Sequence, residues 1–562
     1  MAHPIIECVP NFSEGRDPHK IKQITDQIEK TKGVRLLNVD PGKDTNRTVV
    51  TFVGDPESVI EAAFRAIRKA GEIIDMRIHH GEHPRMGATD VCPLVPVSGI
   101  TMDETVEYAH RLGYRVGEEL GIPGFFYEYA SLQPYKSSLS DCRAGEYEGL
   151  EEKFRDPKWK PDFGPVVFNP RTGATVIGAR DFLVAYNINL NTTSTRRANA
   201  VAFDIREKGR AKRKGDSATG EIERDDKGIP VYIPGSLPAV KAIGWYIKEY
   251  RIAQISMNLT NINITPLHVA FDEACLRAES RGLRVTGSEL IGLVPLKAML
   301  DAGKYFLHKQ KKSSGVSEEE LIRLAMVSLG LNELSPFKPN ERIIEYLIAE
   351  EIKERLPRLT VKEFINETAS DSPAPGGGSV AACVAALGIS LGTMVANISA
   401  HKREMENRWE EFSGWAEKGQ SLKVKLLALM DEDTQAFERV ILAMKMPKAT
   451  PAEAESRKAA LESATKTAIE VPMAVMKTAL DSMEVIGFSA KNGFAGSVTD
   501  AGTGAIMAFA AIQGAWLNVR INCKSMESKA WVTKTLNEAE NIATRAAEKE
   551  KEILSWVEQK LS

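Results

Sequence analysis

Residues 34–53 read VRLLNVDPGKDTNRTVVTFV, in which two apolar, β-branched runs flank the turn signal Pro41-Gly42. Such runs predict neighbouring strands over 34–39 and 47–53. The sequence on either side extends the pattern, with helices predicted over 19–32 and 56–73 and strands over 5–9 and 91–97. The resulting order, βαββαβ, is that of the split βαβ or ferredoxin-like arrangement.

The same order of elements is predicted a second time, after a further helix over 102–120 and a strand over 125–129. The second set has strands over 181–190, 240–250, 253–259 and 283–285 and helices over 193–208 and 266–281. A polar insertion at 209–236 is expected to form a surface loop. The N-terminal half is therefore expected to be α+β, with two ferredoxin-like βαββαβ subdomains at residues 1–180 and 181–334.

The sequence changes character after about residue 340, where strand signals stop. Good helix formers at 3.6-residue spacing dominate 379–399, 403–446, 451–482, 501–518 and 525–560. These segments predict a multidomain chain that ends in an all-α helical bundle at residues 361–562. The expected linker between the two halves lies at residues 335–360.

One apolar run, residues 379–400, contains Gly388-x-x-x-Gly392, a spacing found where membrane helices pack closely. The run barely reaches spanning length, and Ser390, Thr393 and Asn397 dilute it. We therefore expect a helix that is buried inside a bundle, and no membrane span.

Composition narrows the functional classes. The chain has 562 residues, of which 43% are apolar and 27% charged, as in soluble multidomain proteins. A net charge of −3 gives no basis for nucleic-acid binding. Six scattered cysteines without a CxxC pair favour a reducing compartment. The first residues lack the basic and apolar segments of a signal peptide, so a cytoplasmic location is expected.

Three of the nine histidines lie within His79-His80-Gly81-Glu82-His83. The spacing matches the inverted zincin pattern, in which two histidines bind zinc and a glutamate acts as the base. That site requires a helix, which Gly81 and the following Pro84 disfavour. Solvated loop histidines are a second possibility. We favour an acid/base histidine in a fixed loop, because an imidazole pKa of about 6.5 suits proton transfer at neutral pH.

Two other candidates lie in the first half. Asp40 follows the strand over 34–39 and precedes a Pro-Gly turn, where its carboxylate could orient a histidine or only form the turn. Residues 162–175 are rich in glycine and proline. This composition suits a loop that brings its backbone against a flat ligand, although a linker between subdomains has the same composition.

In the second half, Gly376-Gly377-Gly378-Ser379 leads directly into the apolar helix. A glycine run at a helix start leaves backbone N–H groups free for an anion. The Gly-Lys-Ser/Thr ending of a nucleotide-binding loop is missing, so nucleotide binding is not expected. A flexible lead-in to the helix is the alternative.

Asp433 is the second candidate in this half, because it falls within an apolar stripe of the helix predicted over 403–446. A carboxylate on a buried face must be paired, protonated or functional, and burial raises its pKa toward the range useful in catalysis. A buried ion pair is the alternative. The stripe consists of Leu426, Met430, Phe437, Ile441 and Met444, whereas Asp431, Thr434 and Glu438 are expected on the polar side.

Several strings resemble those of one known enzyme family, in the same domain order and over nearly the whole chain. The family is the bifunctional glutamate formimidoyltransferase / formimidoyltetrahydrofolate cyclodeaminase family. The strings are Glu7-Cys8-Val9-Pro10-Asn11-Phe12-Ser13-Glu14-Gly15, Asn46-Arg47-Thr48-Val49, Gly81-Glu82-His83-Pro84-Arg85-Met86-Gly87, Arg143-Ala144-Gly145-Glu146-Tyr147-Glu148, Asn187-Ile188-Asn189-Leu190, Gly292-Leu293-Val294-Pro295-Leu296-Lys297 and Ala374-Pro375-Gly376-Gly377-Gly378-Ser379-Val380-Ala381.

The resemblance implies two successive reactions on folate. The first domain is expected to move the formimino group of N-formimidoyl-L-glutamate to N5 of tetrahydrofolate, a late step of histidine degradation. The helical domain is expected to close the ring to 5,10-methenyltetrahydrofolate and to release ammonia. Tetrahydrofolate is then a co-substrate, expected to be polyglutamylated, and no metal is expected. A homo-oligomer is also expected.

The resemblance assigns residues as well. The family's transferase histidine matches His83, an aspartate beside it matches Asp40, and the cyclodeaminase aspartate matches Asp433. Arg85 and Gly376, Gly377, Gly378 and Ser379 are further candidates for binding substrate or folate. The family's folate-contact segment matches Gly164, Pro165, Val166, Val167, Phe168, Asn169, Pro170, Arg171, Thr172 and Gly173.

Two other hypotheses stay open at this point. One is a transferase whose helical domain is purely structural and drives oligomerisation. The other is a metallohydrolase that uses His79, Glu82 and His83.

Overall fold

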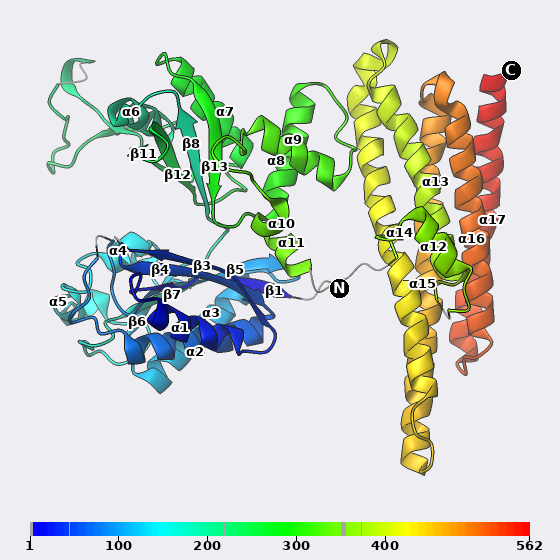
Figure 1. Ribbon diagram of the computed structural model, residues 1–562, viewed down its shortest axis with the longest axis horizontal. Coiled ribbons are helices and arrows are strands. Elements are labelled where there is room, and N and C mark those ends of the chain that lie inside the picture. Colours follow the sequence, from blue (N-terminus) through cyan, green and yellow to red (C-terminus); the bar gives the residue numbers. More distant parts are fainter. Residues whose placement is uncertain (1–3, 44, 82, 217–219, 350–355, 373) are drawn as a thin grey trace. The chain divides into compact units, whose positions relative to one another are not determined.

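The computed structural model describes residues 4–43, 45–81, 83–216, 220–349, 356–372 and 374–562 (Figure 1). The chain folds into two compact units, which we describe separately. The first comprises Met1–Ala298 with Gly330–Glu350, and the second Met299–Leu329 with Glu351–Ser562. The described part of the first unit is a mixed α/β structure with two larger sheets and a two-stranded one, and the second unit is helical, so the two-part architecture predicted from the sequence is confirmed.

The first sheet of the first unit has seven strands, in the order β1-β4-β2-β5-β7-β6, with β3 paired to β4. Pairing is antiparallel except that β7 runs parallel to both β5 and β6. A sheet of this size exceeds the predicted one because β2 and β7 were not expected. The strands are β1 (Ile5–Cys8), β2 (Asn11–Phe12), β3 (Val34–Gly42), β4 (Arg47–Gly54), β5 (Thr89–Ser98), β6 (Gly124–Glu128) and β7 (Thr175–Ala179).

Three helices, α1 (Pro18–Glu29), α2 (Pro56–Ile73) and α3 (Met102–Leu120), cover one face of this sheet (Figure 1). The side chains of Asp17, Asp55 and Thr101 each accept hydrogen bonds from the first turn of a helix, which fixes where the three helices begin. The apolar faces of the helices bury the core against the sheet, around Phe12, Phe52, Phe64 and Phe126. Two short helices, α4 (Leu139–Arg143) and α5 (Leu150–Arg155), follow β6.

The second sheet has the order β11-β12-β8-β13, and all its pairs are antiparallel. The predicted helices are present, but β13 begins only at the last residue of the strand predicted at 283–285 and extends beyond it. Within the insertion at 209–236, β9 (Arg210–Ala211) pairs with β10 (Tyr232–Ile233), and residues 217–219 lie outside the described chain. The other elements are β8 (Val184–Leu190), α6 (Thr195–Ile205), β11 (Val240–Ile247), β12 (Ile252–Leu259), α7 (Leu267–Glu279), β13 (Val285–Ile291), α10 (Pro339–Arg342) and α11 (Ile344–Ala349).

The second unit is a bundle of long helices that run side by side (Figure 1). Small residues allow close helix packing: a Cβ atom on Gly388 would lie 2.8 Å from the backbone oxygen of Gly504. The bundle predicted from the sequence is therefore confirmed. Its helices are α12 (Val361–Thr368), α13 (Gly377–Ala400), α14 (Trp409–Met444), α15 (Pro451–Asn492), α16 (Val498–Cys523) and α17 (Lys529–Leu561).

Two segments of the bundle, Gly377–Ala400 and Ala495–Cys523, are long and apolar enough to cross a membrane by length and composition alone. In their most apolar windows, 61% and 39% of the residues are buried inside the protein. The core helix of a soluble bundle meets the same criteria, and Gly388 of the first segment packs against Gly504 of the second.

The second unit also contains α9 (Glu318–Ser328) and most of α8 (Leu296–Lys309). The loop between these helices packs into the bundle. Ser314 N–H donates to Ser413 Oγ at 3.0 Å, and Asn397 Nδ2 donates to the oxygen of Gly315 at 2.7 Å. A Cβ atom on Gly315 would lie 2.3 Å from that of Ala416, so glycine permits this approach.

Glu7, in the centre of β1, gives a prediction about stability. Its side chain is buried, and burial, partly offset by Arg180, raises its pKa from 4.5 to about 7. The folded chain therefore binds more protons than the unfolded chain between pH 4.5 and 7. The contribution of Glu7 to the free energy of unfolding is therefore highest below pH 4.5, where Glu7 is protonated in both states. It falls by about 3 kcal/mol as the pH rises toward 7.

Glu7→Gln removes this charge and keeps the shape of the side chain. We expect the variant to melt at a higher temperature than the wild type at pH 8 and at nearly the same temperature at pH 4.5. Calorimetry at the two pH values measures the difference. An equal shift at both would show that the effect is not one of ionisation.

Candidate active sites

The histidine segment 79–87 is a loop between α2 and β5, as the sequence predicted from Gly81 and Pro84. Asn46 fixes this loop, because its Nδ2 donates to the backbone oxygen of His80 at 2.9 Å. A Cβ atom on Gly81 would lie 2.2 Å from the oxygen of Thr45, so only glycine allows this approach. Glu82 lies outside the described residues.

His83 is half-buried, and its hydrogen bonds determine its tautomer. Nδ1 donates to the oxygen of Pro84 at 2.7 Å, since a carbonyl can only accept. The lone pair of Nε2 then faces Nη1 of Arg47, which donates to it at 3.1 Å. Burial, followed by the positive charge of Arg47, lowers the pKa of His83 below its ordinary value. His83 is therefore neutral at pH 7, with Nε2 as the basic atom.

Arg47, Asp90 and Arg143 form a charged cluster beside His83 that was not predicted from the sequence. Asp90 is fully buried and accepts from Nη2 of Arg143 at 2.7 Å and from the N–H of Met86 at 3.1 Å. Nη2 of Arg47 lies 3.5 Å from the same carboxylate. The residues come from β4, β5 and α4. Arg47 and Arg143 stand in two of the resemblance strings, whereas nothing in the sequence pointed to Asp90.

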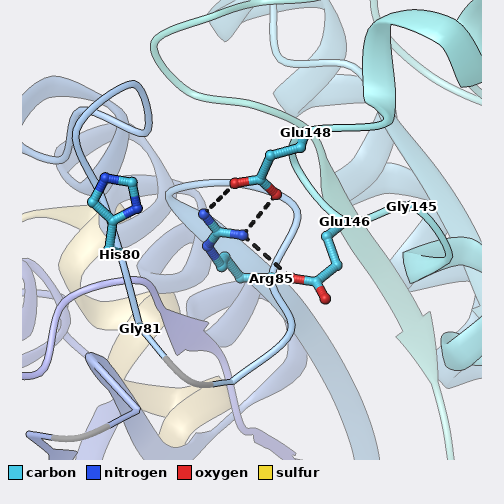
Figure 2. Close-up of a pocket in the computed structure, with 6 residues that line it drawn as sticks. All are labelled: His80, Gly81, Arg85, Gly145, Glu146 and Glu148. Carbon is cyan, nitrogen blue, oxygen red and sulfur yellow. Dashed lines mark hydrogen bonds and ion pairs between the residues drawn. The ribbon is translucent and has the colours of Figure 1, made fainter.

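Arg85 lines a pocket of about 450 Å³ together with His80, Gly81 and Gly145 (Figure 2). Its guanidinium lies between two carboxylates: Nη2 and Nη1 donate to Glu148 at 2.7 and 2.9 Å, and Nη1 also donates to Glu146 at 3.2 Å. This double pairing compensates the charge of Arg85. Its expected role in binding substrate or folate stays a prediction. A carboxylate of a ligand would have to compete for Arg85 with the two carboxylates that already pair with it.

The segment from Gly164 to Gly173 lies beside the histidine loop. The N–H of Ala88 donates to the oxygen of Thr172 at 2.8 Å, and Gly87 forms a β-bridge with Gly173. Val166 and Val167 are exposed, so an apolar surface is open to a ligand there. The structure therefore brings the predicted folate segment next to the loop that carries His83.

Asp40 is exposed near the end of β3, opposite Val49 of β4. Residues two apart on a strand share a face, so Asp40 and Arg47 project from the same face of the sheet. Among the described residues, Asp40 makes no hydrogen bond to His83. Arg47 is instead the residue of this hairpin that touches the imidazole.

The histidine pair of the metallohydrolase hypothesis does not share a helical face here. Nε2 of His79 donates to the oxygen of Asn46 at 2.9 Å, and its Nδ1 accepts from Nε of Arg85 at 3.4 Å. Both ring nitrogens of His79 are thus engaged with the protein. Within the described ranges, which omit Glu82, there is no group of three or more His, Cys, Asp or Glu side chains placed to hold a metal.

In the second unit, the start of α13 meets the middle of α14 at Asp433. Ser379 Oγ donates to Oδ2 of Asp433 at 2.9 Å. A Cβ atom on Gly378 would lie only 2.1 Å from Oδ1 of Asp433, so the absence of a side chain there admits the carboxylate. Burial raises the pKa of Asp433, although the hydrogen bonds from Ser379 act in the opposite direction. The glycine run and the aspartate, chosen separately from the sequence, are neighbours.

Gly377 approaches a residue that the sequence did not suggest. A Cβ atom there would lie 3.2 Å from Nδ2 of Asn518 on α16. Asn518 adds an amide to the same end of α13, and no local pattern in the sequence distinguishes it from other polar residues of its helix.

The apolar stripe predicted for α14 is wrong in part. Phe437 and Met444, expected to be buried, are 44% and 55% exposed, whereas Asp431 and Thr434, expected on the polar side, are buried. The buried carboxylate of Asp431 is satisfied, because it accepts from the N–H of Leu356 at 2.9 Å. Asp433 itself is half-buried at the edge of the packed face. Neighbouring elements, rather than side-chain hydrophobicity alone, decide which face of α14 is covered.

Each of the three parts of the chain matches the model of a known protein family. Residues 5–180 match the family described as the formiminotransferase domain, N-terminal subdomain, and residues 185–349 match the formiminotransferase domain. Residues 360–541 match the family described as formiminotransferase-cyclodeaminase.

Relatives match the whole chain and each half. Formimidoyltransferase-cyclodeaminase of Gallus gallus is 44% identical, over 94% of both chains. Glutamate formimidoyltransferase of Thermoplasma acidophilum is 43% identical over 54% of this chain and 92% of its own. Methenyltetrahydrofolate cyclohydrolase of Methylorubrum extorquens is 30% identical over 36% of this chain and 98% of its own. The resemblance inferred from the short strings is confirmed, and the chain belongs to the formimidoyltransferase-cyclodeaminase family.

Proposed function

We propose that this chain is a bifunctional folate enzyme. It transfers the formimino group of N-formimidoyl-L-glutamate to tetrahydrofolate, and it then cyclises 5-formimidoyltetrahydrofolate to 5,10-methenyltetrahydrofolate and releases ammonia. The observation that carries this proposal is the match to a bifunctional relative over 94% of both chains. Relatives of the separate halves support the assignment of one reaction to each half. One is named as a transferase and the other as a methenyltetrahydrofolate enzyme.

In the transfer step, His83 acts as the acid/base residue. N5 of tetrahydrofolate attacks the amidine carbon, and the proton that N5 loses goes to Nε2 of His83. The imidazolium then returns this proton to the glutamate nitrogen as its bond to carbon breaks. The neutral tautomer, in which Nε2 carries the lone pair, supports this role. Asp40 is proposed to stabilise the transient positive charge, and its position on the same sheet face as Arg47 supports this role.

In the cyclisation step, Asp433 acts as the proton donor. N10 attacks the formimino carbon, and its proton passes to the imino nitrogen, which becomes an amino group. This amino group takes a second proton, from Asp433, and leaves as ammonia, so that the methenyl cation forms. A carboxyl group whose pKa is raised by burial keeps the proton that this step needs. The hydrogen bond from Ser379 holds the carboxyl group in place.

Two segments are proposed to contact folate. At the transfer site this is the loop from Gly164 to Gly173, whose exposed Val166 and Val167 offer apolar contact to the pterin or benzoyl ring. At the second site it is Gly376 to Ser379, where the first turn of α13 presents backbone N–H groups. Polyglutamylated tetrahydrofolate is the proposed co-substrate. Neither reaction requires a metal in this mechanism, and both ring nitrogens of His79 are already hydrogen-bonded.

The proposed domain plan places two ferredoxin-like subdomains at residues 1–180 and 181–334, a linker at 335–360, which is only partly described, and the helical domain at 361–562. The strand orders support this plan. In the first sheet, β5, β1, β4 and β3 are successive neighbours, and in the second sheet β13, β8, β12 and β11 are. Both are the neighbour relations of a βαββαβ unit with antiparallel pairs.

The chain is further proposed to form a cytoplasmic homo-oligomer without a membrane span. Exposed apolar side chains lie on the bundle helices α13 and α16, and a second copy of the chain would cover them. These side chains are Leu387, Met394, Ile506, Leu517 and Ile521. The six cysteines are all free, which fits a reducing compartment.

The test of the proposed function uses the purified full chain with N-formimidoyl-L-glutamate and tetrahydrofolate. Glutamate release measures the transfer, and the absorbance of methenyltetrahydrofolate measures the cyclisation. Glutamate release without any methenyl product, even from preformed 5-formimidoyltetrahydrofolate, would mean that the helical domain is structural. Loss of transfer on treatment with a chelator, together with stoichiometric metal in the untreated protein, would instead support the metallohydrolase hypothesis.

Gly378→Ala tests how closely Asp433 must approach α13. The added methyl group would collide with the carboxylate of Asp433, so we expect ring closure to slow by about 10-fold or more, with transfer unchanged. The matched control is Gly414→Ala on α14, where a Cβ atom meets nothing within 4 Å. Equal loss in the two variants would contradict a specific role for the Gly378–Asp433 contact.

A further inference from the structure

The side chain of Arg47 is only 17% exposed, and its charge is incompletely compensated. One N–H group donates to His83 Nε2, and Nη2 reaches Asp90 at 3.5 Å. Within the part of the chain that the structure describes, the buried Nε atom has no hydrogen-bond acceptor. Burial lowers the pKa of Arg47 to about 10, which is the direction expected for a cation without a full set of partners.

The neighbouring arginines differ from Arg47 in this respect. Arg85 is paired with two glutamates. Arg143 donates to the carboxylate of Asp90 at 2.7 and 3.3 Å. A single carboxylate therefore faces two guanidinium groups, and Arg143 makes the shorter contact with it. The excess positive charge of this cluster lies on Arg47, next to the basic nitrogen of His83.

This arrangement stabilises the neutral imidazole of His83 and destabilises the imidazolium. When Nε2 takes a proton, it loses the lone pair that accepts from Arg47, and an imidazolium would then lie in contact with a guanidinium. Like charges at such a distance repel strongly in a site of low polarity. In addition, Arg47 occupies the direction from which a proton must reach Nε2. Proton transfer thus requires Arg47 to turn toward an anion.

The donor substrate supplies such an anion, because N-formimidoyl-L-glutamate carries two carboxylates. A carboxylate forms two parallel hydrogen bonds with a guanidinium, which a single imidazole nitrogen cannot match. Nε of Arg47 is buried and has no acceptor among the described residues. Together with an Nη group it would form such an edge once the guanidinium has turned toward the donor.

We propose that Arg47 is a specificity and positioning residue, whose guanidinium leaves Nε2 of His83 to bind a carboxylate of the donor. Binding of the anionic donor thereby frees the base. This inference rests on the proposed transfer function. It predicts that an amidine without a carboxylate, such as formamidine, is a poor donor because it cannot draw Arg47 away.

The test compares two donors, N-formimidoyl-L-glutamate and formamidine, in the full chain. The summed 5-formimidoyl- and methenyltetrahydrofolate is measured by mass spectrometry. Arg47→Met should lose about 100-fold or more in kcat/KM with the glutamate donor, while its rate with formamidine stays the same or rises. Arg47→Lys, which keeps the charge but not the planar edge, should restore part of the loss with the glutamate donor.

The pH dependence provides a second readout. With Arg47 removed, the charged groups that face His83 in the described part of the chain, which omits Glu82, are Arg143 and Asp90. The apparent pKa of the base should therefore rise toward the ordinary imidazole value. The rate at which diethyl pyrocarbonate acylates His83, followed by peptide mass spectrometry, measures both the pKa and the accessibility of Nε2 without turnover. We expect faster acylation in Arg47→Met than in the wild type at pH 8.

Arg143→Met is the matched control, because it also removes a guanidinium from Asp90 but none that touches His83. It should lower the rates with both donors by the same factor. Equal loss with both donors in Arg47→Met, or unchanged acylation of His83, would overturn the inference. Absence of transfer in the wild type with either donor would instead refute the proposed function. A circular-dichroism spectrum and a melting transition like those of the wild type verify the fold of each variant.

Discussion

Replacing His83 with alanine is expected to lower kcat for glutamate release by about 100- to 10,000-fold, the contribution of a well-placed acid/base group. The reason is the hydrogen-bond pattern of the imidazole, in which Nδ1 donates to Pro84 and leaves Nε2 as the only basic atom. Alanine removes this atom and leaves the backbone of the loop unchanged. Stopped assays of glutamate release under saturating folate measure the effect.

The same variant should still cyclise preformed 5-formimidoyltetrahydrofolate, since Asp433 lies in the other unit. His19→Ala, an exposed histidine in the first turn of α1, is the matched control and should transfer at the wild-type rate. If His83→Ala kept near-normal transfer, or if His19→Ala lost as much, His83 would not be the acid/base residue.

The pH profile of the wild-type enzyme follows from the same geometry. His83 must be neutral to accept a proton, and burial together with Arg47 lowers its pKa below 6.5. Transfer should therefore be fully active at pH 7 and decline only as the pH falls below 6.5, through the lowered pKa. An acid limb centred above this value would mean that another group limits the rate.

Local sequence patterns predicted the elements whose signals are strong and self-contained. The helices α2 and α3 begin and end where their periodicity and their caps, Asp55 and Thr101, place them. Strand β7 was missed, because five wholly buried residues show no polar alternation and follow a loop rich in glycine. A short parallel strand such as β7 is defined by its hydrogen bonds to β5 and β6. These strands are distant in the sequence, so a local window does not reveal the pairing.

The transfer site shows the same limit. Gly81 and Pro84 were enough to disfavour a helix and with it a metal-binding histidine pair, whereas His83 was selected by the resemblance to the family. The partner of that histidine, Arg47, lies 36 residues away, and Asp90 and Arg143 are 53 residues apart. Contacts between distant segments depend on strand register and loop closure, for which a local pattern carries no information. Arg85, chosen instead because it is close in sequence, proved to be paired with two glutamates.

In the helical domain, Asp433 was selected from a stripe that the structure supports only in part. A single apolar stripe is expected where one neighbour covers one face of a helix. Because α14 packs against both α13 and α15, more than one face of it is covered. Leu356, from outside the bundle helices, also packs near it and binds the buried Asp431. The assignment of Asp433 therefore gains its support from the contact with Ser379 and Gly378, which no periodicity could reveal.

Asp433→Asn is expected to reduce ring closure by about 100- to 10,000-fold and to leave transfer within about twofold of the wild type. Asparagine keeps the shape and still accepts from Ser379, but it cannot donate a proton to the departing amino group. The absorbance of methenyltetrahydrofolate, with preformed 5-formimidoyltetrahydrofolate as substrate, measures the loss. Glu432→Gln removes an exposed carboxylate one residue away and is the matched control.

The pH dependence distinguishes a proton donor from a residue that only shapes the site. A donor must be protonated, so wild-type ring closure should fall as the pH rises through the raised pKa of Asp433. The hydrogen bonds from Ser379 lower this pKa. Ser379→Ala should therefore move the decline to higher pH while reducing the maximal rate less than Asp433→Asn does. A pH profile that does not change in Ser379→Ala, or an Asp433→Asn variant that still forms methenyltetrahydrofolate, would assign the proton to another group.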